Sequence, residues 1–234
     1  MERSRNNKYE FPMGRKKGRD ILTAIVPGLR RMTRDQKAPS VTEVARETRS
    51  PFKVLVSTVI SARTKDEVTG QASRRLFELA STPEEMAALP AARIAKEIYP
   101  AGFYNNKGES IRQLSEKLVR DFDSKVPDTI DQLLTLPGVG RKTANLVLTQ
   151  GFGKDAICVD THVHRIVNRL GVVKSPNPTE SEYALRDILP REHWIEINDL
   201  LVSFGKKVCR PVSPLCSSCL ITEECVRVGV EISR

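Results

Sequence analysis

The chain has 234 residues, of which 29% are charged, and its formal net charge is +9. The length allows one large domain or two small ones, and no apolar run reaches the ~20 residues that a membrane-spanning helix requires. A basic surface attracts polyanions, whereas an aromatic content of only 5% argues against a platform that stacks nucleic-acid bases.

The first part of the chain shows repeated helix starts. Ser40 and Glu43 fit a capping box, in which each side chain bonds the backbone amide of the other residue. Ser50 followed by Pro51 marks a second start, since proline suits the first helical position. Apolar residues recur so densely over residues 54–60 that we expect this helix to be central and buried.

Further helices follow along the chain. Thr82 and Glu85 form another cap, and Asp160 begins a helix that Leu170-Gly171 ends. No segment shows sustained strand alternation with hairpin turns, so we predict an all-α protein of short helices joined by short loops. A mobile basic arm is expected at the N-terminus, with charged side chains at Arg15, Lys16, Lys17 and Arg19.

Residues 136–144 read Leu-Pro-Gly-Val-Gly-Arg-Lys-Thr-Ala and lie between two predicted helices. Gly138 and Gly140 allow backbone angles that other residues avoid, so the turn can be tight and can point its amides outward. Outward amides at a helix start bind an anion, and a DNA phosphate suits such a site without any base being read. The alternative is a corner between two helices that needs glycine only for its geometry.

Lys142 falls in the first turn of the helix that follows these glycines. The positive end of the helix dipole, neighbouring Arg141 and partial burial should favour a neutral amine there, and a neutral amine is a nucleophile. The alternative is a protonated lysine that clamps a phosphate. The residues alone leave both interpretations open.

Asp160 stands in the sequence Val-Asp-Thr-His-Val-His-Arg, residues 159–165. We expect it to be the N-cap of the following helix, which would keep its carboxylate ionised. A fixed negative charge of this kind can stabilise positive charge that develops on a sugar. His162 and His164 do not share a helix face, so we predict structural roles for both.

Four of the five cysteines lie within seventeen residues, in the spacing C-x6-C-x2-C-x5-C: Cys209, Cys216, Cys219 and Cys225. Such a group of thiols ligates zinc or an iron–sulfur cluster, or forms disulfides. The N-terminus is polar and basic and shows no export signal, so disulfides are disfavoured and we expect a cytoplasmic protein. The spacing alone does not choose between zinc and iron.

At these residues the chain resembles the endonuclease III family of DNA glycosylases, within the helix-hairpin-helix superfamily. The resemblance covers about residues 21–225 and rests on three motifs in the same order, namely residues 136–144, residues 159–165 and the four cysteines. Two further segments, Ser61–Asp66 and Gly102–Lys107, resemble family loops that enter the DNA.

The resemblance implies a two-lobed, all-α fold. A six-helix barrel with the helix-hairpin-helix would occupy residues 44–154, and residues 20–43 with 155–234 would form the second lobe. The flexible basic arm expected over residues 1–19 has no counterpart in the family pattern. The second lobe would carry a [4Fe-4S] cluster ligated by Cys209, Cys216, Cys219 and Cys225. A nucleoid-associated monomer that binds damaged double-stranded DNA in the cleft between the lobes is expected.

The resemblance also implies an activity, which is excision of oxidised pyrimidines and strand cleavage 3′ to the abasic site by β-elimination. Lys142 would be the attacking amine and Asp160 the catalytic carboxylate. The DNA-binding residues would be Leu136, Gly138, Val139 and Gly140 in the turn, together with Arg63 and Phe103. Better-known bacterial relatives carry glutamine at the position of Arg63 and leucine at that of Phe103, so the preferred opposite base can differ.

Two other functions fit part of the sequence. Mismatch-specific, uracil-specific or adenine-excising glycosylases of the same superfamily share the turn and the cysteines but typically lack a lysine at the position of Lys142. A non-enzymatic DNA-binding module with a structural metal would explain the charge, the turn and the cysteines. It would not need Lys142 together with Asp160.

Overall fold

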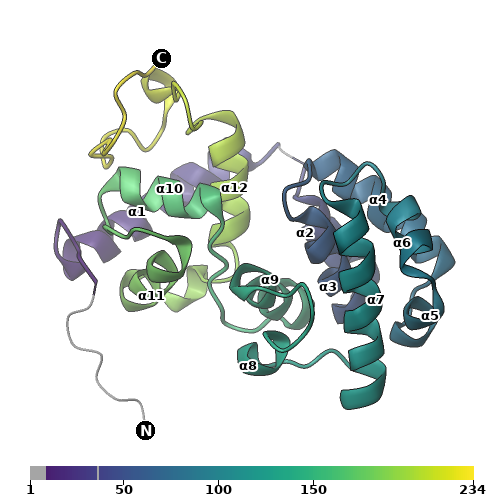
Figure 1. The fold of residues 1–234 in the computed structure, drawn as a ribbon. Helices are drawn as coiled ribbons and strands as arrows, with labels where there is room; N and C mark the ends of the chain where they lie inside the picture. The colour runs from purple at the N-terminus through teal and green to yellow at the C-terminus, as the bar shows by residue number, and fades with distance from the viewer. Residues whose placement is uncertain (1–8, 36) are drawn as a thin grey trace, which may run out of the picture. The chain divides into compact units, whose positions relative to one another are not determined.

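The computed structural model describes residues 9–35 and 37–234, and within this part of the chain the regular secondary structure is helical (Figure 1). The described residues contain no β-strand beyond one isolated bridge between Glu10 and Lys174. The predicted all-α fold class is confirmed. No helix among the described residues has the length and apolar character that crossing a bilayer requires.

The chain divides into two compact units, which are Ala38–Ala156 and Met1–Lys37 together with Ile157–Arg234. The predicted boundaries at residues 44 and 154 assigned Ser40 to the other unit. In the structure the helix that begins at Ser40 packs against the two helices after it, so the boundary lies before that helix.

The unit Ala38–Ala156 holds most of the helices. They are α2 (Ser40–Thr48), α3 (Pro51–Ser61), α4 (Asp66–Leu79), α5 (Pro83–Ala88), α6 (Ala91–Ile98), α7 (Tyr104–Asp121), α8 (Ile130–Leu133) and α9 (Arg141–Leu146), and α9 continues as a π-helical segment, Val147–Gly151. The predicted central helix is α3, in which every residue from Phe52 to Ile60 except Lys53 is buried. It packs against α2, α4, α7 and α9. Each fully buried leucine or isoleucine side chain in it contributes about 1.5–3 kcal/mol to folding.

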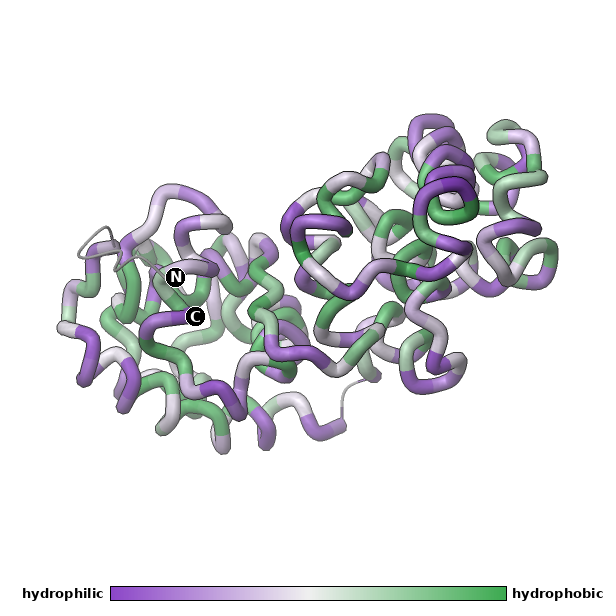
Figure 2. The backbone as a smooth tube through the Cα atoms, turned by 90° about the horizontal axis from the view of Figure 1, so that it is seen from below, coloured by the Kyte–Doolittle hydropathy of each residue, from purple (hydrophilic) through white to green (hydrophobic). Residues whose placement is uncertain are grey.

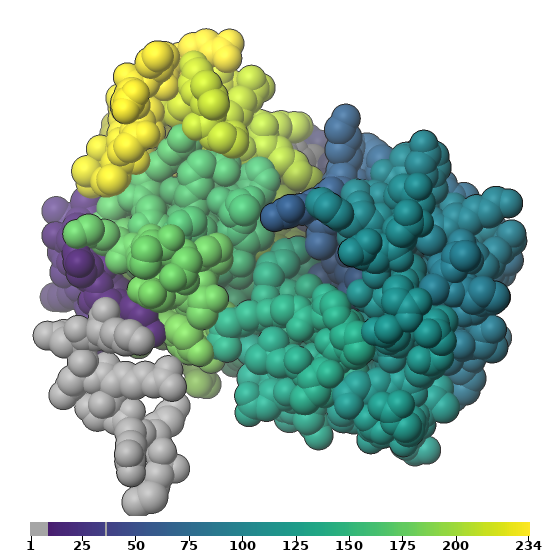
Figure 3. Space-filling model, in the orientation of Figure 1, coloured from purple at the N-terminus to yellow at the C-terminus, as the bar shows by residue number. Residues whose placement is uncertain are grey.

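Among the described residues the other unit contains four α-helices: α1 (Arg15–Thr33), α10 (Thr161–Leu170), α11 (Pro178–Ile188) and α12 (Ile197–Lys207). A short 3₁₀ turn at Arg191–His193 precedes α12, and another at Cys216–Ser218 follows it. Figure 2 shows apolar and polar residues alternating along these helices, as expected when each helix buries one face. The segment after α12, yellow in Figure 3, lies at the surface of this unit.

The predicted N-terminal arm is wrong at its C-terminal end. Residues 1–8 lie outside the described part of the chain, but α1 begins at Arg15 and includes all four basic residues that were assigned to the arm. The cause is the apolar face that starts immediately afterwards: Ile21, Leu22 and Ile25 are buried against α11 and α12. Burying that face stabilises the whole helix, including its exposed basic first turn.

Candidate active site

The glycine turn lies between α8 and α9 and is anchored by two buried apolar residues. Leu136 and Val139 are 3% and 7% exposed, and the Val139 amide donates to the Leu136 carbonyl over 3.1 Å. Gly138 has a φ of +75°, and a Cβ atom there would lie 2.9 Å from Cβ of Ser110 on α7. Only glycine fits this position without strain or displacement.

Gly140 differs from Gly138 although both belong to the same turn. Its φ of −94° is accessible to any residue, and a Cβ atom there would meet no atom within 4 Å. The expectation that both glycines are needed for the turn geometry is therefore wrong for Gly140. Gly140 is the exposed N-cap of α9, so it leaves the first amides of that helix open to a ligand.

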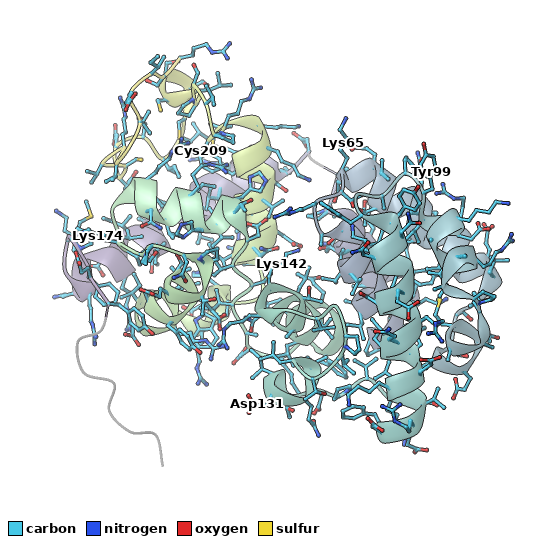
Figure 4. All side chains as sticks on the ribbon, viewed as in Figure 1. Lys65, Tyr99, Asp131, Lys142, Lys174 and Cys209 are labelled. Atoms are coloured by element: carbon cyan, nitrogen blue, oxygen red, sulfur yellow. The ribbon has the colours of Figure 1, made fainter. Side chains whose placement is uncertain are left out.

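Lys142 is the second residue of α9 and is partly buried. Figure 4 shows its side chain at the start of that helix. The turn and the lysine thus form one continuous element, in which open helix amides and a primary amine lie at the same helix end. This combination can grip a phosphate and present a nucleophile beside it.

Asp160 is the N-cap of α10, as predicted. Its Oδ1 atom accepts bonds from the amides of His162 and Val163 over 2.8 and 2.9 Å. Within the described part of the chain Oδ2 accepts no hydrogen bond. One carboxylate oxygen thus fixes the side chain, and the other remains available to stabilise a positive charge.

The two neighbouring histidines make structural contacts. His164 Nδ1 lies 2.6 Å from the hydroxyl of Ser181, and His162 Nδ1 lies 3.1 Å from a guanidinium nitrogen of Arg165. Burial lowers the pKa of both imidazoles. These contacts agree with the structural roles predicted for them.

Arg63 and Phe103, forty residues apart in sequence, lie together in the unit Ala38–Ala156. The guanidinium carbon of Arg63 is 5.6 Å from the centre of the Phe103 ring, and that ring is 61% exposed. Both residues have positive φ angles, 51° and 56°, which are strained for side chains other than glycine. An exposed aromatic ring on a strained backbone is typical of a binding element.

The four clustered cysteines line one pocket in the unit that contains α10 and α12. Their partners in its wall include Phe204 and Leu215. Figure 4 labels Cys209, which follows the end of α12. None of the four forms a disulfide with another described cysteine. Burial is the main cause that raises the pKa of Cys219 and Cys225; backbone hydrogen bonds oppose this rise, and repulsion from the neighbouring cysteines adds to it.

The surroundings of the four cysteines can be compared with those of known metal sites. Among the described residues no three His, Cys, Asp or Glu side chains lie close enough together to hold one ion. Arg169 donates towards the sulfur of Cys209 over 3.5 Å, which places a positive charge beside the thiols. The donor set is soft and partly desolvated, so its chemistry suits a thiolate-bound metal centre, either zinc or an iron–sulfur cluster.

Comparison with known proteins identifies the family of this chain. Residues 56–191 match the model of the HhH-GPD superfamily of base excision DNA repair proteins. Endonuclease III of Thermotoga maritima is 49% identical over 175 residues, which are 75% of this chain and 82% of that protein. The chain belongs to the endonuclease III family.

Other members of the endonuclease III family extend this match. The chain superposes on endonuclease III in a trapped covalent intermediate with DNA with a TM-score of 0.80 and 33% identity, covering 92% of this chain and 97% of that one. The chloroplastic endonuclease III homolog 2 of Arabidopsis thaliana is 39% identical over 86% of this chain. The chain covers only 56% of that longer protein.

The comparisons confirm three predictions, namely the family, the helix-hairpin-helix glycosylase fold and the enzyme class. That class is a bifunctional base excision enzyme, a DNA glycosylase with AP lyase activity for oxidised pyrimidines. Sequence reasoning missed one residue of the site. Lys107 was placed in the segment Gly102–Lys107, which resembles a family loop, but was given no role of its own, and the structure buries it.

Proposed function

We propose that this chain removes oxidised pyrimidines from double-stranded DNA and cleaves the strand 3′ to the abasic site, with Lys142 as nucleophile and Asp160 as catalytic carboxylate. The observation that carries the proposal is the exposed glycine turn, which sets Lys142 in the first turn of α9 beside open helix amides. The covalent intermediate with DNA described for a related endonuclease III supports the same chemistry.

The turn anchors the DNA backbone. Leu136 and Val139 hold it to the core of its unit, while Gly138 and Gly140 leave its amides exposed for a phosphate. Such a contact fixes the register of the enzyme on the strand without reading a base. The damaged nucleotide must leave the helix stack to reach Lys142, which is easiest where damage has already weakened stacking.

Arg63 and Phe103 fill the space that the flipped nucleotide leaves. The Phe103 ring stacks on neighbouring bases, and the guanidinium of Arg63 donates to the base that has lost its partner. Their contact across 5.6 Å allows both to enter the duplex as one unit. Because guanidinium only donates hydrogen bonds, this pair favours opposite bases that present acceptors.

Lys142 then performs the covalent step. Its amine lone pair forms a bond to the sugar C1′ atom, while the glycosidic bond breaks and the base leaves with the bonding electrons and takes up a proton. The adduct opens to a Schiff base between Lys142 and C1′. The Schiff base acidifies the C2′ position, and loss of a C2′ proton expels the 3′ phosphate and cuts the strand.

Asp160 stabilises the positive charge that develops on the sugar as the base departs. Its Oδ1 is held by two amides at the start of α10, so the carboxylate needs no reorganisation during the reaction. Its other oxygen, Oδ2, can also accept a proton from the attacking Lys142 amine and return it later in the reaction.

We further propose that Cys209, Cys216, Cys219 and Cys225 hold a [4Fe-4S] cluster. The pocket that the four cysteines share supports a thiolate-bound metal centre, and membership of the endonuclease III family favours a cluster over a single zinc ion. When bound, the cluster would cross-link the segment after α12 through its four cysteine ligands and would provide a redox-active centre. None of the steps above uses it.

The partner of this protein would be double-stranded DNA containing a damaged pyrimidine or an abasic site, and the chain would act as a monomer. Its basic charge favours association with any DNA and makes the affinity dependent on salt. A cytoplasmic, nucleoid-associated location accords with this partner and remains a prediction, because some relatives are chloroplastic.

Borohydride trapping tests the proposal. A duplex with one thymine glycol is incubated with wild type, Lys142→Ala and Lys125→Ala, which removes an equal charge from an exposed site of the same unit. We expect wild type and Lys125→Ala to form the covalent adduct and Lys142→Ala to form none. If no protein is trapped and only a G·T or uracil duplex loses a base, the mismatch-type activity replaces the proposal. Binding without base loss on any duplex would indicate a DNA-binding module.

A further inference from the structure

Lys107 is a buried lysine with no acidic partner among the described residues. It lies in the first turn of α7 with 7% of its surface exposed. Its Nζ donates to the carbonyl of Ile60 over 2.7 Å, to the carbonyl of Ala62 over 2.5 Å and to the hydroxyl of Thr64 over 2.8 Å. The three protons of the ammonium thus match three acceptors.

All three acceptors belong to the end of α3 and the loop after it. Ile60 is in the last turn of α3, and Ala62 is the C-cap. A cation is favourable at that end of a helix, whereas Lys107 is unfavourably placed at the N-terminal end of its own helix, α7. The charge of Lys107 therefore stabilises the loop that carries Arg63 and does not stabilise α7, the helix that contains Lys107.

The same loop is tied to the segment before α7 by two further contacts. The Thr64 hydroxyl also accepts a bond from the Gly102 amide over 3.1 Å. A Cβ atom on Gly102 would lie only 2.3 Å from the carbonyl oxygen of Arg63, so the two backbones touch at this glycine. Figure 4 shows Lys65 and Tyr99, which flank the two loops, at the end of the unit where α7 begins.

Arg63 and Phe103 are the residues that these ties hold. Each has a positive φ angle, and such strained angles persist only where the surrounding structure imposes them. The Lys107 ammonium lies beneath both strained residues, with one acceptor on each side of Arg63. Burial lowers the pKa of Lys107 to about 8, as expected for an ammonium that neutral acceptors hold away from water.

We propose that Lys107 is a positioning residue, which joins the loops of Arg63 and Phe103 into one rigid element that holds a flipped nucleotide out of the duplex. The inference rests on the proposed function, since it deepens the role given there to Arg63 and Phe103. If Lys107 only completed the core, replacing it would lower the stability of the unit, and the effect of the replacement on excision would be the same whether or not Arg63 and Phe103 were present.

The test is a double-mutant cycle with Lys107→Met, which keeps the apolar stem and removes the three donors. Single-turnover excision of thymine glycol is measured in the wild-type background and in the Arg63→Ala/Phe103→Ala background. We expect Lys107→Met to slow excision about tenfold or more in the first and less than about twofold in the second. Equal losses in both backgrounds would overturn the proposal.

Lys117→Met is the matched control, since Lys117 lies on the same helix and pairs with Asp121 away from the loops. It should leave excision unchanged. If Lys107→Met does not fold, Thr64→Val removes the shared hydroxyl instead. Amide hydrogen exchange then measures the rigidity of the two loops independently of the excision reaction. Faster exchange in residues 62–64 and 102–104, with residues 136–144 unchanged, is expected; unchanged exchange in both loops contradicts the proposal.

A pre-formed abasic site separates this inference from the proposed function. If wild type is not trapped on that site by borohydride, the role of Lys142 fails, while the exchange experiment still tests Lys107. If wild type is trapped and the cycle shows no coupling, the proposed function stands and the positioning role of Lys107 fails.

Discussion

The glycine turn and the paired loops of Arg63 and Phe103 are both proposed DNA-binding elements of the same unit, but they are built differently. The turn is nine consecutive residues, 136–144, and its shape follows from Gly138 and from the burial of Leu136 and Val139. The loops come from two places in the chain and are held by Lys107 and Gly102. A continuous element can be recognised from its sequence, whereas an assembled element depends on contacts that the sequence does not display.

The largest expected effect concerns the chemistry of the continuous element. Lys142→Gln removes the proposed nucleophile and keeps a polar side chain of similar length, so strand cleavage should fall by about 10³-fold or more while DNA binding persists. Cleavage of an abasic duplex is compared with binding to a duplex that carries a non-cleavable abasic analogue. Parallel loss of both would show that Lys142 acts mainly as a phosphate contact.

Asp160 offers a second test of a continuous motif. Asp160→Asn retains an oxygen that can cap α10, so the free energy of unfolding should change by less than about 0.5 kcal/mol. Loss of the negative charge should still reduce base excision by about 10²-fold. Denaturant unfolding and single-turnover excision are measured on the same preparation. A large loss of stability with normal excision would mean that the aspartate is only a cap.

Two glycines sharpen the comparison between the elements. Gly102→Ala forces the two loops apart because its Cβ would lie 2.3 Å from the Arg63 carbonyl oxygen, and it should cost about 1–3 kcal/mol. Gly140→Ser, in open space at the N-cap of α9, should leave stability unchanged or slightly higher but weaken binding to abasic-analogue DNA. Denaturant unfolding and titration with abasic-analogue DNA are measured for both variants to test these expectations. Equal destabilisation by both would contradict the distinction.

The smallest expected effect is a pH dependence of stability. The pKa of Lys107 is about 8 in the folded chain and 10.5 as its ordinary value, so between these pH values the unfolded chain binds a proton that the folded chain lacks. This group therefore makes the free energy of unfolding rise with pH in that window, by up to about 1 kcal/mol per pH unit. Urea unfolding at pH 8 and pH 10 should show this rise in wild type and lose it in Lys107→Met.

Capping residues show why some of the fold was predictable and some was not. Thr82 and Glu85 form the predicted capping box with both of its bonds, because the pattern is local. Ser40 forms no such box with Glu43. Its amide and hydroxyl bond instead to Asp66, twenty-six residues later, so a distant partner replaced the local one.

The same reasoning separates the site residues. Asp160 was predictable as a cap because the amides that donate to its carboxylate lie only two and three residues later in the chain. The turn was predictable from its glycines. Lys107 was not, since its three partners precede it by more than forty residues. The four cysteines stood out by their spacing, but only the fold shows that they share one pocket.

The order of the two units along the chain has a consequence for folding during synthesis. All residues of the unit Ala38–Ala156 are available once residue 156 has been made, so this unit can fold before synthesis ends. The apolar face of α1 must wait for α11 and α12, its partners more than a hundred residues later. The four clustered cysteines are synthesised after the unit Ala38–Ala156, so ribosome-bound chains would already carry the glycine turn and Lys142 before any group could bind to these thiols.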